Sequence, residues 1–516
     1  MSHVDAPPPG PDFALGVPLA DLATAGVLTG HVDGEPVLLS RLHDGIFAVG
    51  GACTHYGAAL ADGLMVDGQV HCPWHHACFD LRTGAALKAP AFAALRTWQV
   101  DIVDEQVFVR AAADTVDDEP VAVTASVNAR SAPERIVIVG GGAAGFAAAE
   151  RLRALGFGGT LTMLSADDAA PCDRPNLSKD YLAGTASEDW IPLQSSDFYA
   201  DKQIDLRLSC EVEAIDTTTR SVRNRSGDPI GYDALLLATG AEPVRLDMPG
   251  FDLPNVFTLR SLADARAIIA ATADARSAVL IGAGFIGLEV ADALRTRGLD
   301  VHVVAREQVP MEKVLGPELG HAIVQLHREH GVEFHLGRAP AQFDGRSVTL
   351  DDGAAIAADL VIVGVGVRPR TGLAAAAGLA VDNGIVVDAQ LQSSMPGVYA
   401  AGDVARFRRG PDLLRIEHWV HAERQGQCVA QNMLGQARTF DDVPFFWSHH
   451  YDMDIRYVGH AQAWDEVRFE GSFAARDCIA RYFGQGRLLA AATVGRDVQN
   501  LAIEAELASS LRSAAH

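Results

Sequence analysis

The feature that most constrains the fold is a pair of glycine-rich turns, each placed between a run of β-forming residues and the start of a helix. The first reads Arg135-Ile-Val-Ile-Val-Gly140-Gly-Gly142-Ala-Ala-Gly145, and a helical pattern follows from Phe146. In such a Gly-x-Gly-x-x-Gly turn the glycines permit the sharp bend, close approach of a pyrophosphate and tight helix–strand packing. The helix N-terminus then favours the anion. This segment therefore predicts a doubly wound α/β domain that binds a dinucleotide.

A second turn of the same kind lies further along the chain. The strand-like Ser277-Ala-Val-Leu-Ile leads into Gly282-Ala-Gly284-Phe-Ile-Gly287, and a helical pattern containing Glu289 follows. One glycine-rich turn is a weak signal, but two turns in the strand–turn–helix context predict two bound dinucleotides.

Two other segments end in small residues at positions where a ligand could approach the backbone. A buried strand pattern ends in Ala238-Thr239-Gly240, and a later one ends in Gly402-Asp403. Glycine lets the backbone approach a ligand closely, and an aspartate there can accept a hydrogen bond from a hydroxyl.

The front of the chain carries a set of metal-ligating residues. Cys53-Thr-His55 is followed, after sixteen residues, by Cys72-Pro-Trp-His75. Two thiolates and two imidazoles suit a [2Fe–2S] centre in which one iron takes both cysteines and the other takes both histidines. Zinc is the competing metal, but zinc fingers place paired cysteines before paired histidines, whereas the two types alternate here. We predict these four residues as ligands of an iron–sulfur cluster.

Composition and charge narrow the function classes. The 66 acidic residues outnumber the 42 basic ones, giving a net charge of −24, which disfavours nucleic acid and anionic membranes as partners. The seven cysteines include no Cys-x-x-Cys pair, which indicates a reducing compartment without a disulfide-reductase centre. Neither an apolar N-terminal signal nor a run long enough to span a bilayer is apparent, so we expect a cytoplasmic protein.

The two ligand motifs resemble those of Rieske [2Fe–2S] proteins, over about residues 12–112. High-potential members carry an additional cysteine in each ligand loop, joined as a disulfide. Here Gly57 follows the first motif and Cys78 stands alone, so the resemblance implies a ferredoxin-like, low-potential centre and a free, inert Cys78. It also implies that both imidazoles lie at the surface, where an electron would enter or leave.

The rest of the chain, about 134–500, resembles the flavoprotein reductases that bind two dinucleotides. The branch containing the ferredoxin reductases of oxygenase systems and apoptosis-inducing factor is indicated by Asp173-Arg174-Pro-Asn-Leu-Ser-Lys179. An N-terminal Rieske domain on such a reductase is the arrangement of the apoptosis-inducing-factor-like Rieske flavoproteins. This resemblance implies FAD at the first turn and NADH or NADPH at the second.

The resemblance also assigns residues to each cofactor. Those implied for FAD are Gly140, Gly142, Gly145, Asp167, Arg174, Lys179, Ala238, Thr239, Gly240, Gly402, Asp403, Trp419 and Trp447. Asp167 is chosen for the ribose, with Asp168 as the alternative, and the two tryptophans would lie beside the flavin ring. Lys179, paired with Glu289, would lie near the reactive edge of the flavin and act as the catalytic pair.

Residues implied for the nicotinamide nucleotide are Gly282, Gly284, Gly287, Glu289, Arg306 and Gly366. Where an NAD-selective site usually has an acid, Ala305 stands at the end of the predicted strand. Arg306 could accept the 2′-phosphate of NADPH, and Glu307 could still reach the ribose of NADH. The resemblance to the family favours NADH as the donor, but the residues at this strand end leave both NADH and NADPH open.

Three histidines, His421, His449 and His450, suggest a further metal site. Since no other ligands stand at suitable spacing, we expect surface or partner-facing histidines instead.

The predicted fold has a small all-β Rieske domain, two doubly wound α/β dinucleotide-binding domains and a C-terminal α+β domain. The predicted order is the Rieske domain at 12–112, a linker at 113–133, the FAD domain at 134–245 and 371–410, the inserted NAD(P) domain at 246–370, and the C-terminal reductase domain at 411–516.

We therefore predict an NAD(P)H-dependent electron-transfer oxidoreductase. A hydride would pass to FAD, and single electrons would pass to the cluster and on to an oxygenase component, a cytochrome P450, a ferredoxin or a small-molecule acceptor. A homodimer is possible in this family. The alternatives are a redox-sensing protein like apoptosis-inducing factor, and an NAD(P)H oxidase that uses the Rieske domain for docking.

Overall fold

The computed structural model describes residues 10–22, 26–112, 133–225, 227–410 and 412–514. Residues 113–132 of the predicted linker lie outside this set. Contacts divide the chain into two compact units. The first contains the described residues of Met1–Ser126, Glu150–Phe157 and Arg496–Ala514, and the second contains the described residues of Val127–Ala149 and Gly158–Gly495.

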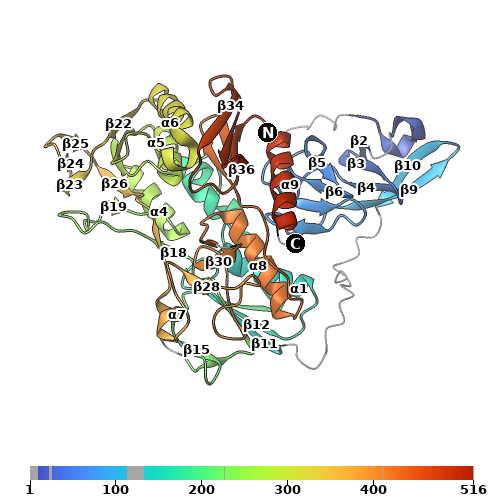
Figure 1. Ribbon diagram of the computed structural model, residues 1–516, viewed down its shortest axis with the longest axis horizontal. Helices are drawn as coiled ribbons and strands as arrows, with labels where there is room; N and C mark the ends of the chain where they lie inside the picture. Colours follow the sequence, from blue (N-terminus) through green and yellow to red (C-terminus); the bar gives the residue numbers. More distant parts are fainter. Residues whose placement is uncertain (1–9, 23–25, 113–132, 226, 411, 515–516) are drawn as a thin grey trace. The chain divides into compact units, whose positions relative to one another are not determined.

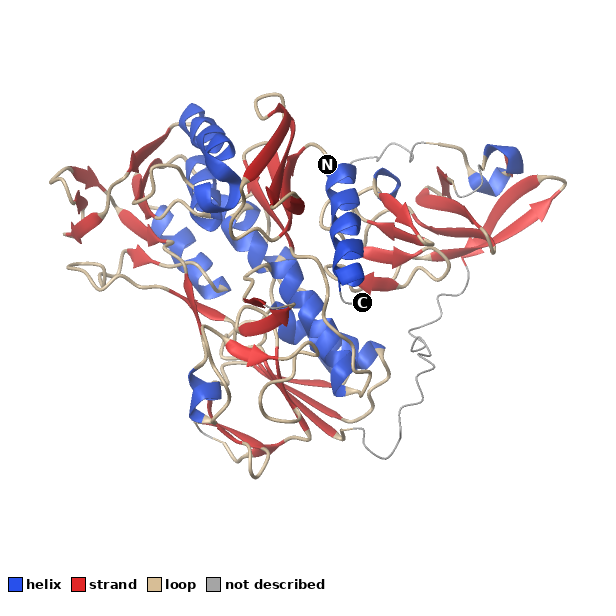
Figure 2. Ribbon diagram, viewed as in Figure 1, coloured by secondary structure: helices blue, strands red, loops and turns tan. Residues whose placement is uncertain are grey.

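The first unit is built from two antiparallel sheets and the last helix of the chain (Figure 2). The larger sheet has the order β1 (Val17–Pro18), β10 (Gln106–Ala112), β9 (Thr97–Val103), β4 (Gly45–Gly50), β3 (Glu35–Leu42), β2 (Val27–Val32). The smaller sheet has the order β5 (Leu64–Val66), β6 (Gln69–His71), β7 (Cys78–Asp80), β8 (Ala86–Lys88). The helix is α9 (Asp497–Ala514), and short 3₁₀ turns are η1 (Phe13–Leu15), η2 (Leu19–Asp21) and η3 (Leu60–Asp62).

Strand β3 lies between two apolar cores, which explains its unbroken run of buried residues. Val37 and Leu39 pack into one core with Trp98, while Leu38 packs into the other with Phe79. Successive side chains of a strand point to opposite faces, so one apolar strand can serve both cores. The second core also contains the two cysteines of the ligand motifs.

The first dinucleotide-binding fold of the second unit is a parallel sheet. Its order is β13 (Ile204–Arg207), β12 (Thr160–Leu164), β11 (Arg135–Val139), β17 (Ala234–Leu237), β29 (Val398–Ala400). The first glycine-rich turn connects β11 to α1 (Ala143–Ala154). Strands β11 and β17 are apolar and buried, as parallel strands covered on both faces require. Because β29 comes from late in the chain, this sheet is completed only after an insertion.

The inserted segment forms a second parallel sheet. Its order is β19 (Val256–Phe257), β26 (Leu360–Val363), β20 (Ser277–Ile281), β21 (Asp300–Ala305), β22 (Val332–Leu336). Helices α5 (Phe285–Thr296) and α6 (Glu312–Glu329) share an apolar core with one face of this sheet. The other face packs with the antiparallel sheet of β23 (Pro340–Phe343), β24 (Ser347–Leu350) and β25 (Ala355–Ala357), which Figure 1 shows apart from α5 and α6.

The C-terminal sheet is antiparallel and brings its first strand to helix α5. Its order is β32 (Phe445–His450), β33 (Met453–Gly459), β36 (Arg487–Val494), β35 (Asp477–Gly484), β34 (Glu466–Ser472). Ile455, Tyr457 and Tyr482 of this sheet belong to the same apolar core as α5 and α6. This packing places β32 beside the helix that follows the second glycine-rich turn.

The remaining elements connect these sheets. The helices are η4 (Arg174–Ser178), α2 (Asp180–Ala183), η5 (Glu188–Trp190), α3 (Ser196–Asp201), α4 (Leu262–Thr272), α7 (Gly372–Ala376) and α8 (Trp419–Met433). The strands are β14 (Val212–Asp216), β15 (Ser221–Asn224), β16 (Ile230–Gly231), β18 (Ala241–Pro243), β27 (Val367–Pro369), β28 (Ile385–Val387), β30 (Ala405–Arg409) and β31 (Asp412–Leu414). Within the described parts of the chain, no helix combines the length and apolar character needed to cross a membrane.

The predicted fold class is confirmed: a small all-β part, two doubly wound α/β parts and a β-rich C-terminal part. The predicted domain boundaries remain predictions.

Candidate active site and metal centre

The two ligand motifs form two loops with the same backbone turn. In each loop the amide of the cysteine, Cys53 or Cys72, donates to the carbonyl five residues on, and its own carbonyl accepts from the amide four residues on. The residue at that fourth position has a positive φ in both loops, 78° at Gly57 and 62° at His76. Glycine adopts this conformation at little cost, whereas the fully buried His76 is held by Glu504 of α9, with 2.5 Å between His76 Nδ1 and Glu504 Oε2.

The four predicted ligands come together as two pairs. The thiols of Cys53 and Cys72 are buried and contact each other, and this contact with burial raises the pKa of Cys53. The imidazoles of His55 and His75 face each other with 3.2 Å between their Nδ1 atoms. Burial lowers the pKa of His55 to about 4, so the ring is neutral at pH 7, the form that binds metal.

This pairing fits a two-iron cluster better than a single zinc ion. A tetrahedral zinc would need all four ligand atoms at its corners, within about 4 Å of one another. Among the described residues, no three of these four side chains bring their ligand atoms within 4.8 Å of one another. Separate cysteine and histidine pairs are the arrangement that a Rieske cluster requires.

The surroundings of the imidazoles differ from the expectation in one respect. His55 is partly exposed and stacks on the exposed Tyr56, but His75 is only 7% exposed, so the expectation of two surface imidazoles is wrong for His75. The exposed Trp74 lies edge-on to His75. Cys78 is buried and forms no disulfide with another described cysteine, and its Sγ lies 3.1 Å from the side-chain oxygen of Gln69.

The first glycine-rich turn has the geometry of a dinucleotide site. Gly140 has a φ of 118°, and a Cβ there would lie 2.1 Å from the carbonyl oxygen of Ala238. A Cβ on Gly145 would lie 1.9 Å from the oxygen of Gly140, so this glycine is needed for helix–strand packing. On Gly142 the atoms nearest to a Cβ would be those of the Arg174 guanidinium, at 3.7 Å. The packing of the protein therefore requires the first and third glycines, and the second leaves room for a pyrophosphate.

The second turn repeats this pattern. Gly282 has a φ of 108°, and a Cβ there would lie 2.3 Å from the oxygen of Gly364. A Cβ on Gly287 would lie 2.6 Å from the oxygen of Gly282. Around Gly284, nothing among the described residues lies within 4 Å of the added Cβ. A glycine that packing does not require, at the N-terminus of α5, fits a site where a phosphate approaches the backbone.

Both turns open into one cavity of about 1820 Å³ within the second unit. The predicted residues that line it are Gly140, Gly142, Asp167, Arg174, Lys179, Ala238, Thr239, Gly240, Gly282, Gly284, Gly287, Glu289, Gly366, Gly402, Asp403, Trp419 and Trp447. Two predicted residues are not part of the lining: Gly145, which packs behind the turn, and Arg306. A cavity of this size with two such turns fits two dinucleotides.

Buried polar atoms on the cavity wall also point to a ligand. Among the described residues, His418 Nδ1, Arg260 Nε and Arg415 Nε are buried without a hydrogen-bond partner, and all three side chains line the cavity. Buried polar atoms are normally paired, so such atoms around a cavity indicate polar groups of a bound molecule. The residues present thus fit FAD and a nicotinamide nucleotide.

Two ion pairs lie along the cavity. Arg174 donates to Asp167 Oδ2 at 2.9 Å, which places the predicted ribose carboxylate beside the first turn. Its alternative, Asp168, lines a smaller neighbouring pocket and not the main cavity. Arg260 donates to Asp403 Oδ2 at 2.6 Å, so this aspartate, which is predicted to bind FAD, is held by a cation.

A buried carboxylate with three donors lines the cavity. Glu289 of α5 is 4% exposed, and its Oε2 accepts from Lys179 Nζ at 2.9 Å and from Ser178 Oγ at 2.5 Å. Its Oε1 accepts from Ser448 Oγ of β32 at 2.6 Å. The Lys179 ammonium also lies 5.8 Å from the centre of the Trp447 ring. The predicted Lys179–Glu289 pair is therefore present, and it joins η4, α5 and β32.

The end of strand β21 was predicted to select between NADH and NADPH, and the side chains that follow it are exposed. Arg306 and Glu307, directly after β21, are both exposed, and neither lines the cavity. The choice between NADH and NADPH therefore stays open.

Several residues of this site were not predicted from the sequence. Ser178 and Ser448 are the serines next to Lys179 and Trp447, and Arg260 precedes the cap of α4. For the two serines, adjacency to predicted residues was the available signal, because their shared partner Glu289 is remote in sequence. Arg260 offered no such signal, since its partner Asp403 is also remote in sequence.

The expectation of surface histidines is wrong for two of the three. His421 and His450 are buried, at 1% and 0% exposure. His449 is partly buried and bonds to Asp454, with 2.8 Å between Nδ1 and Oδ1.

The family comparisons cover most of the chain. The description "Pyridine nucleotide-disulphide oxidoreductase" matches residues 134–426, "Rieske [2Fe-2S] domain" matches 17–99 and "Reductase C-terminal" matches 445–514.

Individual relatives agree with these families. Apoptosis-inducing factor 3 of Homo sapiens is 33% identical over 476 residues, covering 89% of this chain and 78% of that protein. The ferredoxin reductase subunit of 5,5′-dehydrodivanillate O-demethylase from Sphingobium sp. is 38% identical over 370 residues, covering 70% of this chain and 90% of that protein. In the covalent putidaredoxin reductase–putidaredoxin complex, the matching chain has a TM-score of 0.71 at 34% identity, covering 73% of this chain and 94% of that chain. This chain thus belongs to the pyridine nucleotide-disulphide oxidoreductase family, as a ferredoxin-reductase-type NAD(P)H oxidoreductase with FAD and a Rieske [2Fe–2S] domain.

Proposed function

We propose that this protein takes electrons from NAD(P)H at the large cavity and delivers them singly, through its Rieske centre, to an acceptor protein. The observation that carries the proposal is the joining of two dinucleotide turns and a buried Lys–Glu pair in one cavity, in a chain that also holds paired cysteine and histidine ligands. When bound, FAD would accept a hydride and give up single electrons, and the cluster would carry one electron at a time.

The residues of the chain would bind and orient these groups. The turns at Gly142 and Gly284 would take the two pyrophosphates, and Asp167 and Asp403 would accept hydrogen bonds from hydroxyls. Their guanidinium partners hold both carboxylates in place. The buried carboxylate of Glu289 would fix the Lys179 ammonium at the reactive edge of the flavin. Trp419 and Trp447 would cover the ring and exclude water.

For the acceptor we propose an oxygenase component, a cytochrome P450 or a ferredoxin. The O-demethylase reductase subunit and the putidaredoxin reductase complex are relatives whose names state such a role. The Rieske domain of this chain would take the place that putidaredoxin holds in the second of these. The donor nucleotide, the homodimer and the cytoplasmic location remain predictions.

The test is a set of anaerobic and aerobic turnover rates of the holoenzyme with NADH and NADPH. The proposal expects fast NAD(P)H oxidation with a one-electron acceptor such as cytochrome c, and slow oxidation with oxygen alone. A high rate with oxygen alone would instead support an oxidase. Slow oxidation with every acceptor, together with a long-lived reduced flavin–nucleotide complex, would support a redox sensor.

A further inference from the structure

A continuous chain of buried side chains leads away from Glu289. Beyond the bond from Ser448 to Glu289, Ser448 Oγ lies 3.0 Å from His450 Nε2. His450 Nδ1 lies 3.2 Å from His327 Nε2, and His327 Nδ1 lies 3.1 Å from the Tyr451 hydroxyl. Ser448, His450 and His327 are each 0% exposed, whereas Tyr451 is partly exposed.

The chain ends at the surface of the second unit. The Tyr451 ring stacks on His330, an exposed residue, with 3.7 Å between ring centres. Strand β32 supplies Ser448 and His450 from the same face, and α6 supplies His327. Two elements remote in sequence thus build one path from the cavity to solvent.

The hydrogen-bond directions along this path can be worked out from the Glu289 end. Burial lowers the pKa of His450 to about 3 and that of His327 well below its ordinary value, so each ring is neutral with one N–H. As a carboxylate already bound to Lys179 and Ser178, Glu289 can only accept, so Ser448 must donate to it. The Ser448 oxygen then accepts from His450 Nε2–H, and His450 Nδ1 accepts from His327 Nε2–H. This leaves His327 Nδ1 to accept from the hydroxyl of Tyr451.

We propose that Tyr451, His327, His450 and Ser448 form a proton relay between solvent and Glu289. This inference rests on the proposed function of the cavity, because flavin redox chemistry exchanges protons as well as electrons. In one passage, Ser448 gives its hydroxyl proton to Glu289 Oε1 and takes one from His450 Nε2. His450 takes a proton from His327 at Nδ1, His327 takes the hydroxyl proton of Tyr451, and Tyr451 takes one from solvent. One proton enters, one reaches Glu289, and no electron moves.

The relay is tested in the holoenzyme with His450→Gln and Ser448→Ala. A glutamine side chain can still form hydrogen bonds. Unlike an imidazole, it cannot take up a proton on one atom and release another proton from a second atom. The matched control is His449→Gln, the neighbouring residue on β32, which bonds to Asp454 and not to the relay. An indicator dye would follow proton exchange with solvent during anaerobic reduction by NADH, in parallel with flavin bleaching.

If the relay operates, both variants should exchange protons with solvent at least about tenfold more slowly than the wild type, because a path for general acid–base transfer is lost. The control should exchange protons at the wild-type rate. A second readout is independent of turnover: ¹⁵N NMR of histidine-labelled oxidised holoenzyme should find His450 and His327 protonated at Nε2. Unchanged proton exchange in both variants, or protonation of His450 at Nδ1, would overturn the relay. If electrons failed to reach the cluster, the proposed function would be refuted. The test of the relay would still stand, because proton exchange is measured during reduction of the flavin and does not depend on the cluster.

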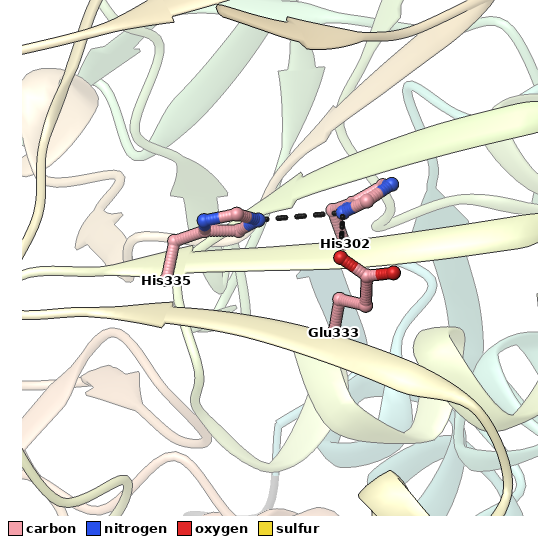
Figure 3. A group of neighbouring side chains, drawn as sticks. All are labelled: His302, Glu333 and His335. Atoms are coloured by element: carbon pink, nitrogen blue, oxygen red, sulfur yellow. Dashed lines mark hydrogen bonds and ion pairs between the residues drawn. The ribbon is translucent and has the colours of Figure 1, made fainter. Parts of the chain in front are cut away.

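A separate observation concerns the second dinucleotide sheet. His302 on β21 lies opposite Glu333 on the neighbouring strand β22, and His335 follows two residues later on the same face (Figure 3). His302 Nδ1 lies 3.3 Å from His335 Nε2 and 3.4 Å from Glu333 Oε2. All three ligand atoms lie within 4.8 Å of one another.

These spacings match the edges of a metal coordination tetrahedron. Zinc bonds of 2.0–2.1 Å to nitrogen and oxygen place neighbouring ligand atoms about 3.3 Å apart. The exposed Glu333 leaves an entry path for an ion from solvent.

We infer that His302, Glu333 and His335 bind a divalent transition-metal ion such as Zn²⁺. The probe is Co²⁺, titrated into cluster-loaded holoenzyme and followed by difference absorption, since loading keeps the ligands of the Rieske centre occupied. One equivalent should bind in the wild type and in the control His43→Ala, an exposed histidine of the first unit, and none in His302→Ala or His335→Ala. Equal binding in these two variants, or no wild-type binding at about 1 mM Co²⁺, would overturn the site.

Discussion

Replacing Glu289 with leucine tests the buried ion pair between Lys179 and Glu289 that lines the cavity. The change leaves the Lys179 side chain, 12% exposed, without its counter-ion at 2.9 Å, and leaves Ser178 and Ser448 without their acceptor. At an effective dielectric of 20, the lost attraction is about 6 kcal/mol, and desolvation of both charges offsets part of it. Losses of about 3–5 kcal/mol are typical when one partner of a buried pair is removed. We expect a fall of this size in the free energy of unfolding.

The assay is denaturation of the holoenzyme, followed by circular dichroism, in a cycle with Lys179→Met and the double variant. Because the double variant leaves no unpaired buried charge, it should recover at least about half of the loss caused by Glu289→Leu. The matched control is Glu466→Ala, which breaks the exposed pair with Arg468 and should cost less than about 1 kcal/mol. A loss below about 1 kcal/mol for Glu289→Leu, or a double variant that loses the sum of both single changes, would refute the reasoning.

Three further predictions concern the turns, the pH dependence and the cluster. Gly284→Ala should weaken NAD(P)H binding measured by titration without lowering the melting temperature, whereas Gly282→Ala, with its φ of 108° and close contact, should cost about 2–3 kcal/mol of stability. The bond to Asp454 raises the pKa of His449, and, although burial opposes it, the same bond lowers the pKa of Asp454. The raised pKa of His449 contributes stability that is fully present below the pKa of the unfolded state and is lost as the pH rises through the pKa of the folded state. The lowered pKa of Asp454 contributes stability that is lost as the pH falls through the acid range. His449→Gln should therefore lower the melting temperature more at pH 6 than at pH 9, and an equal effect at both would contradict this pairing. Cys72→Ser should abolish the reduced-cluster signal in electron paramagnetic resonance while NAD(P)H still bleaches the flavin, and a cluster signal of wild-type intensity would exclude Cys72 as a ligand.

The sequence predicted those parts of the site that are built from a few residues at a short, fixed spacing. The ligand motif around Cys53 and the glycine turn at Gly140 are local patterns, and each geometry follows from a few consecutive residues. Ser448 could not be assigned in this way, because its partner Glu289 lies on another element and only the packing of β32 on α5 joins them.

Two of the buried histidines differ in how far the sequence indicates their burial. In β32 the burial alternates at its end, with Ser448 and His450 inward and His449 partly exposed. The two-residue period of a strand would have placed His450 beside Ser448, on the inward face. His421 is buried because almost all of α8 is enclosed, which a polar helix sequence does not indicate.

The most direct test of the central claim is freeze-quenched electron paramagnetic resonance of the holoenzyme mixed anaerobically with NADH or NADPH. We predict that the reduced Rieske signal grows at least as fast as steady-state turnover with a one-electron acceptor. Bleaching of the flavin while the cluster stays oxidised on that timescale would contradict electron delivery through the Rieske centre.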